Sequence, residues 1–218
     1  MKSIRYLIGF ALMALLLSGC MANAEPEGTF GSAAYDIYNL HISFKDSLGN
    51  DLVAPLGEEM YNSAPNSTRY RGQINPDKYS LYIQFSNGTY VNNAEFLLKK
   101  YDENYSLMSA KTDGTYDEKG DWSLYYNLVG IGKKSDDELF ATMTFRFQCE
   151  TIFGDVSYHD IITWWKEGSR ERDNRVQYCE CSSATIDGKE IKPIKGVSYN
   201  DKGEPYYVGY FLDIVLER

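Results

Sequence analysis

The sequence predicts an all-β protein, a β-sandwich of about nine to ten antiparallel strands with an immunoglobulin-like arrangement. Three observations predict it. Apolar and polar residues alternate along most of the chain, which is the period of a half-buried strand. Turn signals built from Asn, Asp and Gly separate these segments at short intervals. Aromatic residues make up 15% of the chain, with 19 Tyr, and such side chains suit a pleated surface. A closed barrel is the alternative.

The first strands are expected between residues 35 and 129. Residues 35–44 alternate, and a shift of phase before Leu40 predicts a bulge. A turn is expected where Asp and Gly gather, over residues 46–51. Residues 79–85 alternate and stop at Asn87-Gly88, a hairpin signal. The next expected segments are residues 96–101 and 105–111, which are predicted to pair with each other, and residues 122–129.

The longest alternation in the middle of the chain covers residues 139–149. Residues 156–166 are apolar on both faces, which predicts a central strand that is covered on both sides. No stretch has the pattern of a long amphipathic helix, and residues 136–141 make a helical turn at most. The remaining strands are expected at residues 176–186, 190–199 and 206–216, separated by Asp187-Gly188 and by residues 201–203.

The amino terminus has the pattern of a lipoprotein signal. Lys2 and Arg5 precede an uncharged apolar segment that is too short to span a bilayer. Its end, Leu17-Ser18-Gly19-Cys20, resembles the lipobox of bacterial lipoproteins, which implies cleavage before Cys20 and lipidation of that thiol. We therefore expect a signal peptide over residues 1–19, a lipidated cysteine and flexible tether over 20–33, and one β-sandwich domain over 34–218. An ordinary signal peptide with an incidental cysteine is the alternative.

The charge of the chain argues against two classes of partner. Without the signal, the chain keeps 20 basic and 31 acidic residues, a formal charge of −11. Nucleic-acid binding needs a basic face, and attraction to anionic lipid needs a basic cluster. We therefore expect no nucleic-acid partner and a membrane contact made by the lipid anchor.

Three cysteines remain in the domain, Cys149, Cys179 and Cys181. An exported domain meets an oxidising compartment, so one disulfide and one free thiol are expected. Cys179 and Cys181 are two apart on one strand and are not expected to join. Cys149 is expected to pair with one of them, with Cys181 favoured. The Cys-x-Cys spacing and the presence of only two histidines argue against a metal site, and no cofactor is expected.

The sequence carries no catalytic signature. His159 and Asp160 are neighbours, but adjacent residues of a strand point to opposite faces and do not orient one another. His41 is expected on the surface. The acidic residues between Asp113 and Asp121 lack the order of a calcium loop and are read as a turn. A pair of carboxylates brought together by the fold stays an open alternative.

Trp164 and Trp165 are the candidate binding residues. On a strand one indole points inward and the other outward, where it can stack on a sugar ring or anchor a protein contact. Burial of both under a loop is the alternative. Asp46-Ser47-Leu48 resembles an acceptor motif for O-glycosylation in exported Bacteroides proteins, which implies modification of Ser47. A local basic group follows the tryptophans, at Lys166, Arg170, Arg172 and Arg175.

Several segments resemble those of uncharacterised cell-envelope lipoproteins of Bacteroides and related bacteria. The resemblance covers most of residues 35–216 and includes residues 35–38, 44–53, 149–155 and 188–193. It implies a lipid-anchored envelope protein of unknown function and transfers no catalytic or binding residue.

Together these observations predict an outer-membrane lipoprotein, on the periplasmic or the surface-exposed face, that acts as a non-catalytic binding module for a glycan or protein. One alternative is a structural or accessory subunit of an envelope assembly. Another is a hydrolase that works through carboxylates.

Overall fold

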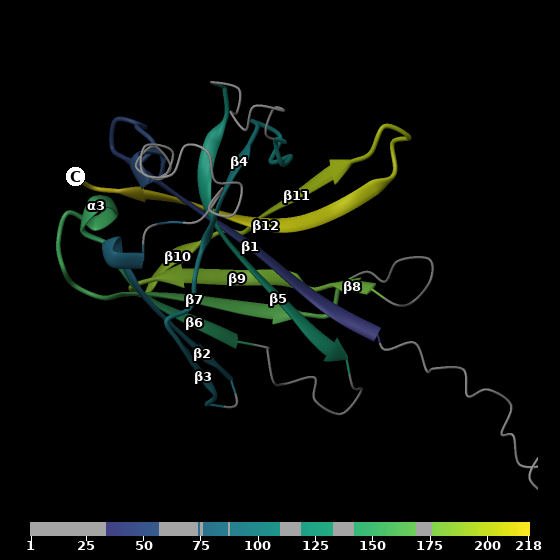
Figure 1. The fold of residues 1–218 in the computed structure, drawn as a ribbon, viewed down its shortest axis with the longest axis horizontal. Helices are drawn as coiled ribbons and strands as arrows, with labels where there is room; N and C mark the ends of the chain where they lie inside the picture. Colours follow the sequence, from purple (N-terminus) through teal and green to yellow (C-terminus); the bar gives the residue numbers. More distant parts are fainter. Residues whose placement is uncertain are drawn as a thin grey trace, which may run out of the picture. The chain divides into compact units, whose positions relative to one another are not determined.

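The computed structural model describes residues 34–56, 74, 76–86, 88–109, 119–132, 142–168 and 176–218. The predicted signal peptide, Cys20 and the tether lie outside these residues. The prediction of an all-β sandwich is confirmed, because two six-stranded sheets enclose one apolar core (Figure 1). The immunoglobulin-like arrangement stays a prediction.

The first sheet has the strand order β11, β12, β1, β5, β4, and β8 also pairs with β1. The bounds are β11 Ile194–Tyr199, β12 Pro205–Leu216, β1 Ala34–Asp46, β5 Asp121–Gly132, β4 Leu97–Tyr101 and β8 Val176–Tyr178.

The second sheet has the order β10, β9, β7, β6, β2, β3. Its strands are β10 Lys189–Ile191, β9 Glu180–Ile186, β7 His159–Lys166, β6 Thr142–Gln148, β2 Ser80–Phe85 and β3 Tyr90–Asn92. Two short helical segments, η2 Pro76–Lys78 and α3 Glu150–Phe153, complete the described elements.

The described strands number twelve, more than expected, and not all of them are antiparallel. β1 runs parallel to β12 over residues 40–46 and parallel to β8 over residues 35–37. Two segments predicted as single strands are each divided. The segment 176–186 leaves the first sheet and enters the second at Cys179, and the segment 190–199 is interrupted at Lys192-Pro193, where proline has no N–H to donate.

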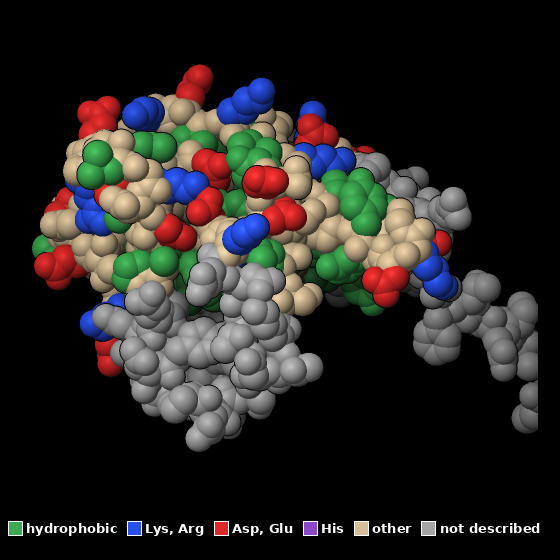
Figure 2. Space-filling view, turned by 90° about the horizontal axis from the view of Figure 1, so that it is seen from above, with side chains coloured by type: hydrophobic (Ala, Val, Ile, Leu, Met, Phe, Trp, Pro, Cys, Tyr) green, Lys and Arg blue, Asp and Glu red, His purple; other side chains and the backbone are tan. Residues whose placement is uncertain are grey.

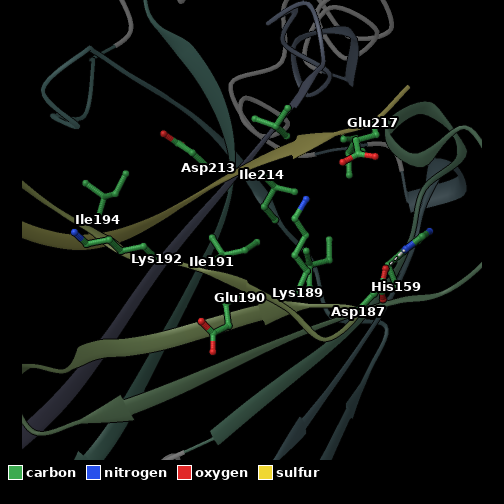
Figure 3. Close-up of a pocket in the computed structure, with 13 residues that line it drawn as sticks. His159, Asp187, Lys189, Glu190, Ile191, Lys192, Ile194, Asp213, Ile214 and Glu217 are labelled. Atoms are coloured by element: carbon green, nitrogen blue, oxygen red, sulfur yellow. Dashed lines mark hydrogen bonds and ion pairs between the residues drawn. The ribbon is translucent and has the colours of Figure 1, made fainter.

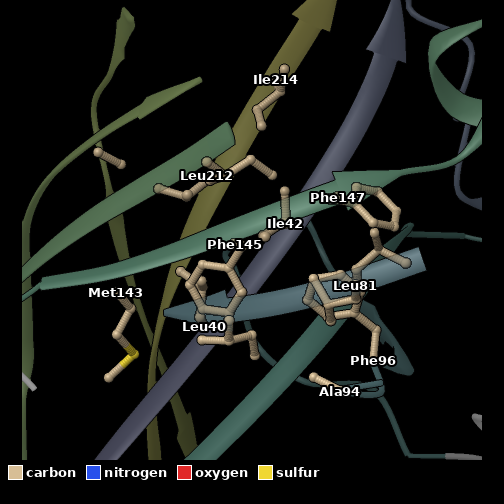
Figure 4. Packing of buried hydrophobic residues seen from close by; sticks show 14 of the residues in the cluster. Leu40, Ile42, Leu81, Ala94, Phe96, Met143, Phe145, Phe147, Leu212 and Ile214 are labelled. Atoms are coloured by element: carbon tan, nitrogen blue, oxygen red, sulfur yellow. The ribbon is translucent and has the colours of Figure 1, made fainter. Parts of the chain in front are cut away.

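The core lies between the inward faces of the two sheets (Figure 4). Leu40, Ile42 and Phe44 of β1 face it from the first sheet, and each is at most 1% exposed. Phe145 and Phe147 of β6 face it from the second sheet and are fully buried. The rings of Phe44 and Phe147 lie 6.3 Å apart between centroids. Alternation along each strand thus supplies the core, as the sequence predicts.

β1 is also buried on its other face, which the sequence does not predict. Asn39, His41 and Ser43 are all nearly inaccessible to solvent. The Ser43 hydroxyl donates to the Asp213 carboxylate at 2.6 Å, and the hydroxyls of Tyr101 and Tyr105 donate to the same carboxylate at 3.2 and 2.6 Å. This side of the first sheet is therefore a polar and aromatic layer.

The predicted bulge in β1 is absent, since its pairing with β5 runs without a shift from Ala34 to Ile42. The change of phase has another cause. Near the start of β1 the apolar residues Tyr35 and Ile37 lie on the outer face, whereas Leu40 and Ile42 lie on the core face.

The predicted pairing of residues 96–101 with 105–111 is found only beside the turn that joins them. An isolated bridge links Tyr101 to Leu107, and next to it the Met108 N–H donates to the Lys100 carbonyl at 2.8 Å. The full ladder of β4 is formed with β5. The segment after the turn also contacts β11, where the Ser106 hydroxyl donates to the Val197 carbonyl at 3.0 Å.

The turn at Asp187-Gly188 is confirmed. Ile186 pairs with Lys189 across these two residues, whose φ angles are +48° and +81°. Positive φ at both central residues is the geometry of the tight hairpin turn that suits twisted strands, and Asp-Gly is one of the sequences that favour it.

Candidate functional site

Trp164 and Trp165 occupy opposite faces of β7. Trp165 is 6% exposed, its ring contacts Tyr38 and Tyr210 edge-on, and its indole N–H donates to the Thr163 hydroxyl at 2.8 Å. Trp164 is 36% exposed on the outer face of the second sheet. The indole available to a ligand is therefore that of Trp164, because Trp165 belongs to the core.

β7 is a central strand, but its outer face is not covered as predicted. On that face, Ile162 is half-buried and Trp164 is exposed to solvent.

An irregularity in β9 places two serines beside Trp164. Trp164 pairs with Ser183, whereas Trp165 pairs with Cys181, so Ser182 is an extra residue in the ladder. The Ser182 hydroxyl donates to the Trp164 carbonyl at 3.1 Å. Because of this bulge, Ser182 and Ser183 are both exposed although they are consecutive. The sequence shows no sign of the bulge, since its position depends on pairing between distant strands.

A groove of about 730 Å³ extends from Trp164 across β9 toward β10. We call it the Trp164 groove. Its polar lining comprises the hydroxyls of Ser182, Ser183 and Thr185, together with Glu190 and Lys192. The groove therefore combines an aromatic surface with hydroxyl, carboxylate and ammonium groups. Among the described lining residues, Glu190 is the single carboxylate, whereas glycoside hydrolysis through carboxylates needs two.

His159 and Asp160 do not act on one another. Asp160 forms a two-pronged ion pair with the Arg146 guanidinium at 2.9 and 3.1 Å. The His159 ring lies 2.6 Å from the Asp187 carboxylate and stacks on Phe153 with centroids 3.7 Å apart. The contact between His159 and Asp187 joins the hairpin turn to β7 (Figure 3). Within the described part of the chain, no Ser, Thr or Cys side chain is hydrogen-bonded to His159, so the ring has no nucleophile to activate there.

The expectation that His41 lies on the surface is wrong. The ring is fully buried between Tyr125 and Phe211, with centroids 4.7 and 4.2 Å away. Its two nitrogens lie 2.9 Å from the Ser123 hydroxyl and 2.5 Å from the Tyr207 hydroxyl. Burial lowers the pKa of His41 to about 3, and the Lys99 ammonium acts in the same direction. His41 is therefore a neutral structural residue.

The predicted disulfide is also wrong, because all three cysteines of the domain are buried and none is joined to another by a disulfide. Cys149 follows Phe147, which pairs with His159 at one end of β7, whereas Cys181 pairs with Trp165 at the other end. Six residues of strand span about 20 Å. A disulfide needs Cα atoms within about 7 Å. Burial raises the pKa of Cys179 and of Cys181 to about 12, so neither thiol forms a reactive thiolate at neutral pH.

Ser47 lies in the exposed turn that follows β1, and its hydroxyl donates to the Arg218 carbonyl at 3.1 Å. Its modification stays a prediction. Lys166 forms a 2.8 Å ion pair with Glu180, while Arg170, Arg172 and Arg175 lie outside the described residues.

Most of the acidic segment from Asp113 to Asp121 also lies outside the described residues; its last member, Asp121, pairs with Lys45 at 2.6 Å. In the described part of the chain, no three His, Cys, Asp or Glu side chains are placed to hold a metal ion.

On the face that Figure 2 shows, acidic and basic side chains are interspersed, and neither sign of charge forms a continuous patch. In the described part of the chain, no helix is long and apolar enough to cross a membrane. Comparison with protein-family models, curated proteins and solved structures finds no match to this chain.

Proposed function

We propose that this chain is a lipid-anchored, non-catalytic binding domain of the bacterial outer membrane, and that its Trp164 groove binds a glycan. The observation that carries the proposal is the exposed indole of Trp164 beside the two serines that the bulge turns outward.

The lining of the groove suits a sugar ring. One side of a pyranose is a layer of C–H groups, which is attracted to the electron-rich face of an indole. The hydroxyls at the edge of the ring need hydrogen-bond partners, and Ser183, Thr185, Glu190 and Lys192 offer both donors and acceptors along the groove. Binding sites for small molecules commonly combine an apolar surface with a few polar groups that fix orientation.

The lipid anchor rests on the sequence. The apolar segment and Leu17-Ser18-Gly19-Cys20 resemble a lipoprotein signal, and the resemblance to envelope lipoproteins agrees with it. Several acyl chains on Cys20 would hold the domain on a membrane stably. Intact-mass measurement of the native protein tests this part: a mass that retains residues 1–19, or an unmodified Cys20, would refute it.

A glycan array followed by calorimetric titration tests the groove. Trp164→Ala is expected to weaken binding to an array-positive glycan at least tenfold, and Trp164→Phe, which keeps a ring, less. Tyr90→Ala is the matched control, because Tyr90 is an exposed aromatic residue, 61% accessible, on the β3 edge of the same sheet and outside the groove. Equal losses in the two alanine variants would refute the assignment. A silent array, with a protein partner that co-purifies only when Trp164 is present, would refute the glycan and favour a protein ligand.

A further inference from the structure

A patch of uncharged side chains lies on the outer face of the first sheet, where β8, the start of β1 and the end of β5 lie together (Figure 1). Tyr35 and Ile37 of β1 point to that face, away from the core. Tyr35 pairs with Val176 of β8. Ile37 pairs with Tyr178 of β8 on one side and with Val129 of β5 on the other. Because paired residues of neighbouring strands point to the same face, these five side chains adjoin, and we call them the Tyr35 patch.

The patch is accessible to solvent and carries no charge. Tyr35 is 41% exposed and Val129 is 51% exposed, and the other three members are half-buried. The next residues on that face, Asn39 and Asn127, are uncharged as well. Asp36 lies on the opposite face of β1, because neighbouring residues of a strand alternate. Within residues 35–39, 127–129 and 176–178, no charged side chain points to the face of the Tyr35 patch.

The tether that the sequence predicts joins the domain beside this patch. β1 begins at Ala34, and Cys20 lies fourteen residues before it. A coil of that length has an average end-to-end distance of about 20 Å. A lipid on Cys20 would therefore keep the start of β1 close to the bilayer, at an effective concentration in the millimolar range. At such a concentration, a weak contact between domain and membrane is enough to orient the domain.

The chemistry of the patch fits the headgroup region of a bilayer. Tyrosine is enriched at membrane–water interfaces, because its ring is apolar and its hydroxyl is polar. The rest of the domain is less suited to this contact. Without the signal, the chain has 31 acidic and 20 basic residues, so anionic headgroups repel the protein as a whole. An uncharged patch is the part of the surface that approaches such headgroups at the least electrostatic cost.

We propose that the Tyr35 patch rests on the headgroups of the membrane that holds the Cys20 lipid, and that this contact orients the domain. The two sheets enclose the core between them, so their outer faces point away from one another. Trp164 lies on the outer face of the second sheet. In this orientation, the Trp164 groove faces away from the membrane and is open to a ligand. The contact rests on the lipid anchor proposed above and does not depend on glycan binding.

The test uses the native acylated protein on phosphatidylcholine vesicles that contain a lipid with a nitroxide in its headgroup. A fluorescent dye is attached to the cysteine that Val129→Cys introduces, since the native thiols of the domain are buried. The nitroxide is expected to quench this dye at least twofold. Tyr90→Cys with the same dye is the matched control, because Tyr90 is 61% exposed on the edge strand of the second sheet and should stay unquenched.

A charge placed in the patch should weaken the contact. Tyr35→Glu is expected to reduce the quenching at position 129 at least twofold, whereas Tyr90→Glu should leave it unchanged. Circular dichroism verifies that each variant is folded. If Tyr35→Glu does not fold, the comparison between dyes at positions 129 and 90 decides the proposal alone.

Two outcomes would overturn the contact while leaving the anchor intact. One is vesicle-bound protein with equal quenching at positions 129 and 90. The other is a blue-shifted dye at position 129 that the nitroxide does not quench, which would make the tether or a second copy of the chain the cover of the patch. Acylated protein that stays in solution would overturn the anchor and the contact together. Trp164→Ala should not change the quenching, so the glycan proposal fails or stands separately.

Discussion

The buried His41 makes the stability of the domain depend on pH in a defined window. Its pKa is about 3 in the folded chain against 6.5 for an exposed histidine. The unfolded chain therefore takes up a proton as the pH falls below about 6.5, while the folded chain does not, and unfolding is favoured. The stabilisation due to neutral His41 is complete above pH 6.5 and declines until the folded pKa is reached.

The magnitude follows from the two pKa values. Each pH unit within the window costs about 1.4 kcal/mol. Between pH 7.5 and pH 5.0, this one group should lower the free energy of unfolding by about 2 kcal/mol.

Urea unfolding at a series of pH values measures the effect, and His41→Gln isolates it. Glutamine keeps hydrogen-bonding capacity toward Ser123 and Tyr207 but does not titrate. The variant should be less stable at pH 7.5, and the difference from the native chain should shrink by about 2 kcal/mol at pH 5.0. Parallel pH dependence in the two chains would refute the reasoning, because it would mean that His41 protonates equally well in the folded and unfolded states.

Three further outcomes are expected. Phe147→Ala should lower the free energy of unfolding by about 3–5 kcal/mol in urea titrations, because the fully buried ring contacts Phe44 and two further phenylalanines. A loss below about 1 kcal/mol would contradict this packing. Gly196→Ala should destabilise by about 1–3 kcal/mol or more, because a Cβ there would overlap the Tyr105 carbonyl oxygen and the Phe211 ring. In the chain from residue 21, thiol titration at pH 7 should find no reactive cysteine in the folded protein and three after denaturation; reaction in the native state would show that the thiols are accessible.

The fold class follows from the sequence because alternation is a local property. β2, β6 and β12 lie where the pattern of apolar residues places them, each within a few residues. What the pattern cannot give is the sheet to which a strand belongs. Residues 176–186 look like one strand, yet the chain changes sheets at Cys179, because pairing partners far along the chain decide each half.

The site was predictable only in part. Alternation places Trp164 and Trp165 on opposite faces, but the strand alone does not tell which face is the core. His41 shows the same limit. Apolar and polar residues alternate along its strand, and in such a pattern the polar residues normally face solvent. Here, however, tyrosines from β5 and β12 cover the face on which His41 lies. The disulfide was predicted from the oxidising compartment in which an exported domain folds. The two candidate cysteines, Cys149 and Cys181, lie at opposite ends of β7, and this separation depends on strand pairing that the sequence does not show.

The parallel contact between β1 and β12 joins the two ends of the domain. β1 lies at the centre of the first sheet, yet one of its neighbours is the last strand of the chain. Contacts between residues so far apart along the chain form late in folding. The chain must first lose the conformational entropy of closing a large loop, and only then do these contacts stabilise it. While the protein is being synthesised, the amino-terminal strand must wait for residues 205–216 to leave the ribosome. Until then the unpaired backbone edge of β1 remains open to other chains, and rapid completion of the carboxy-terminal strand protects it.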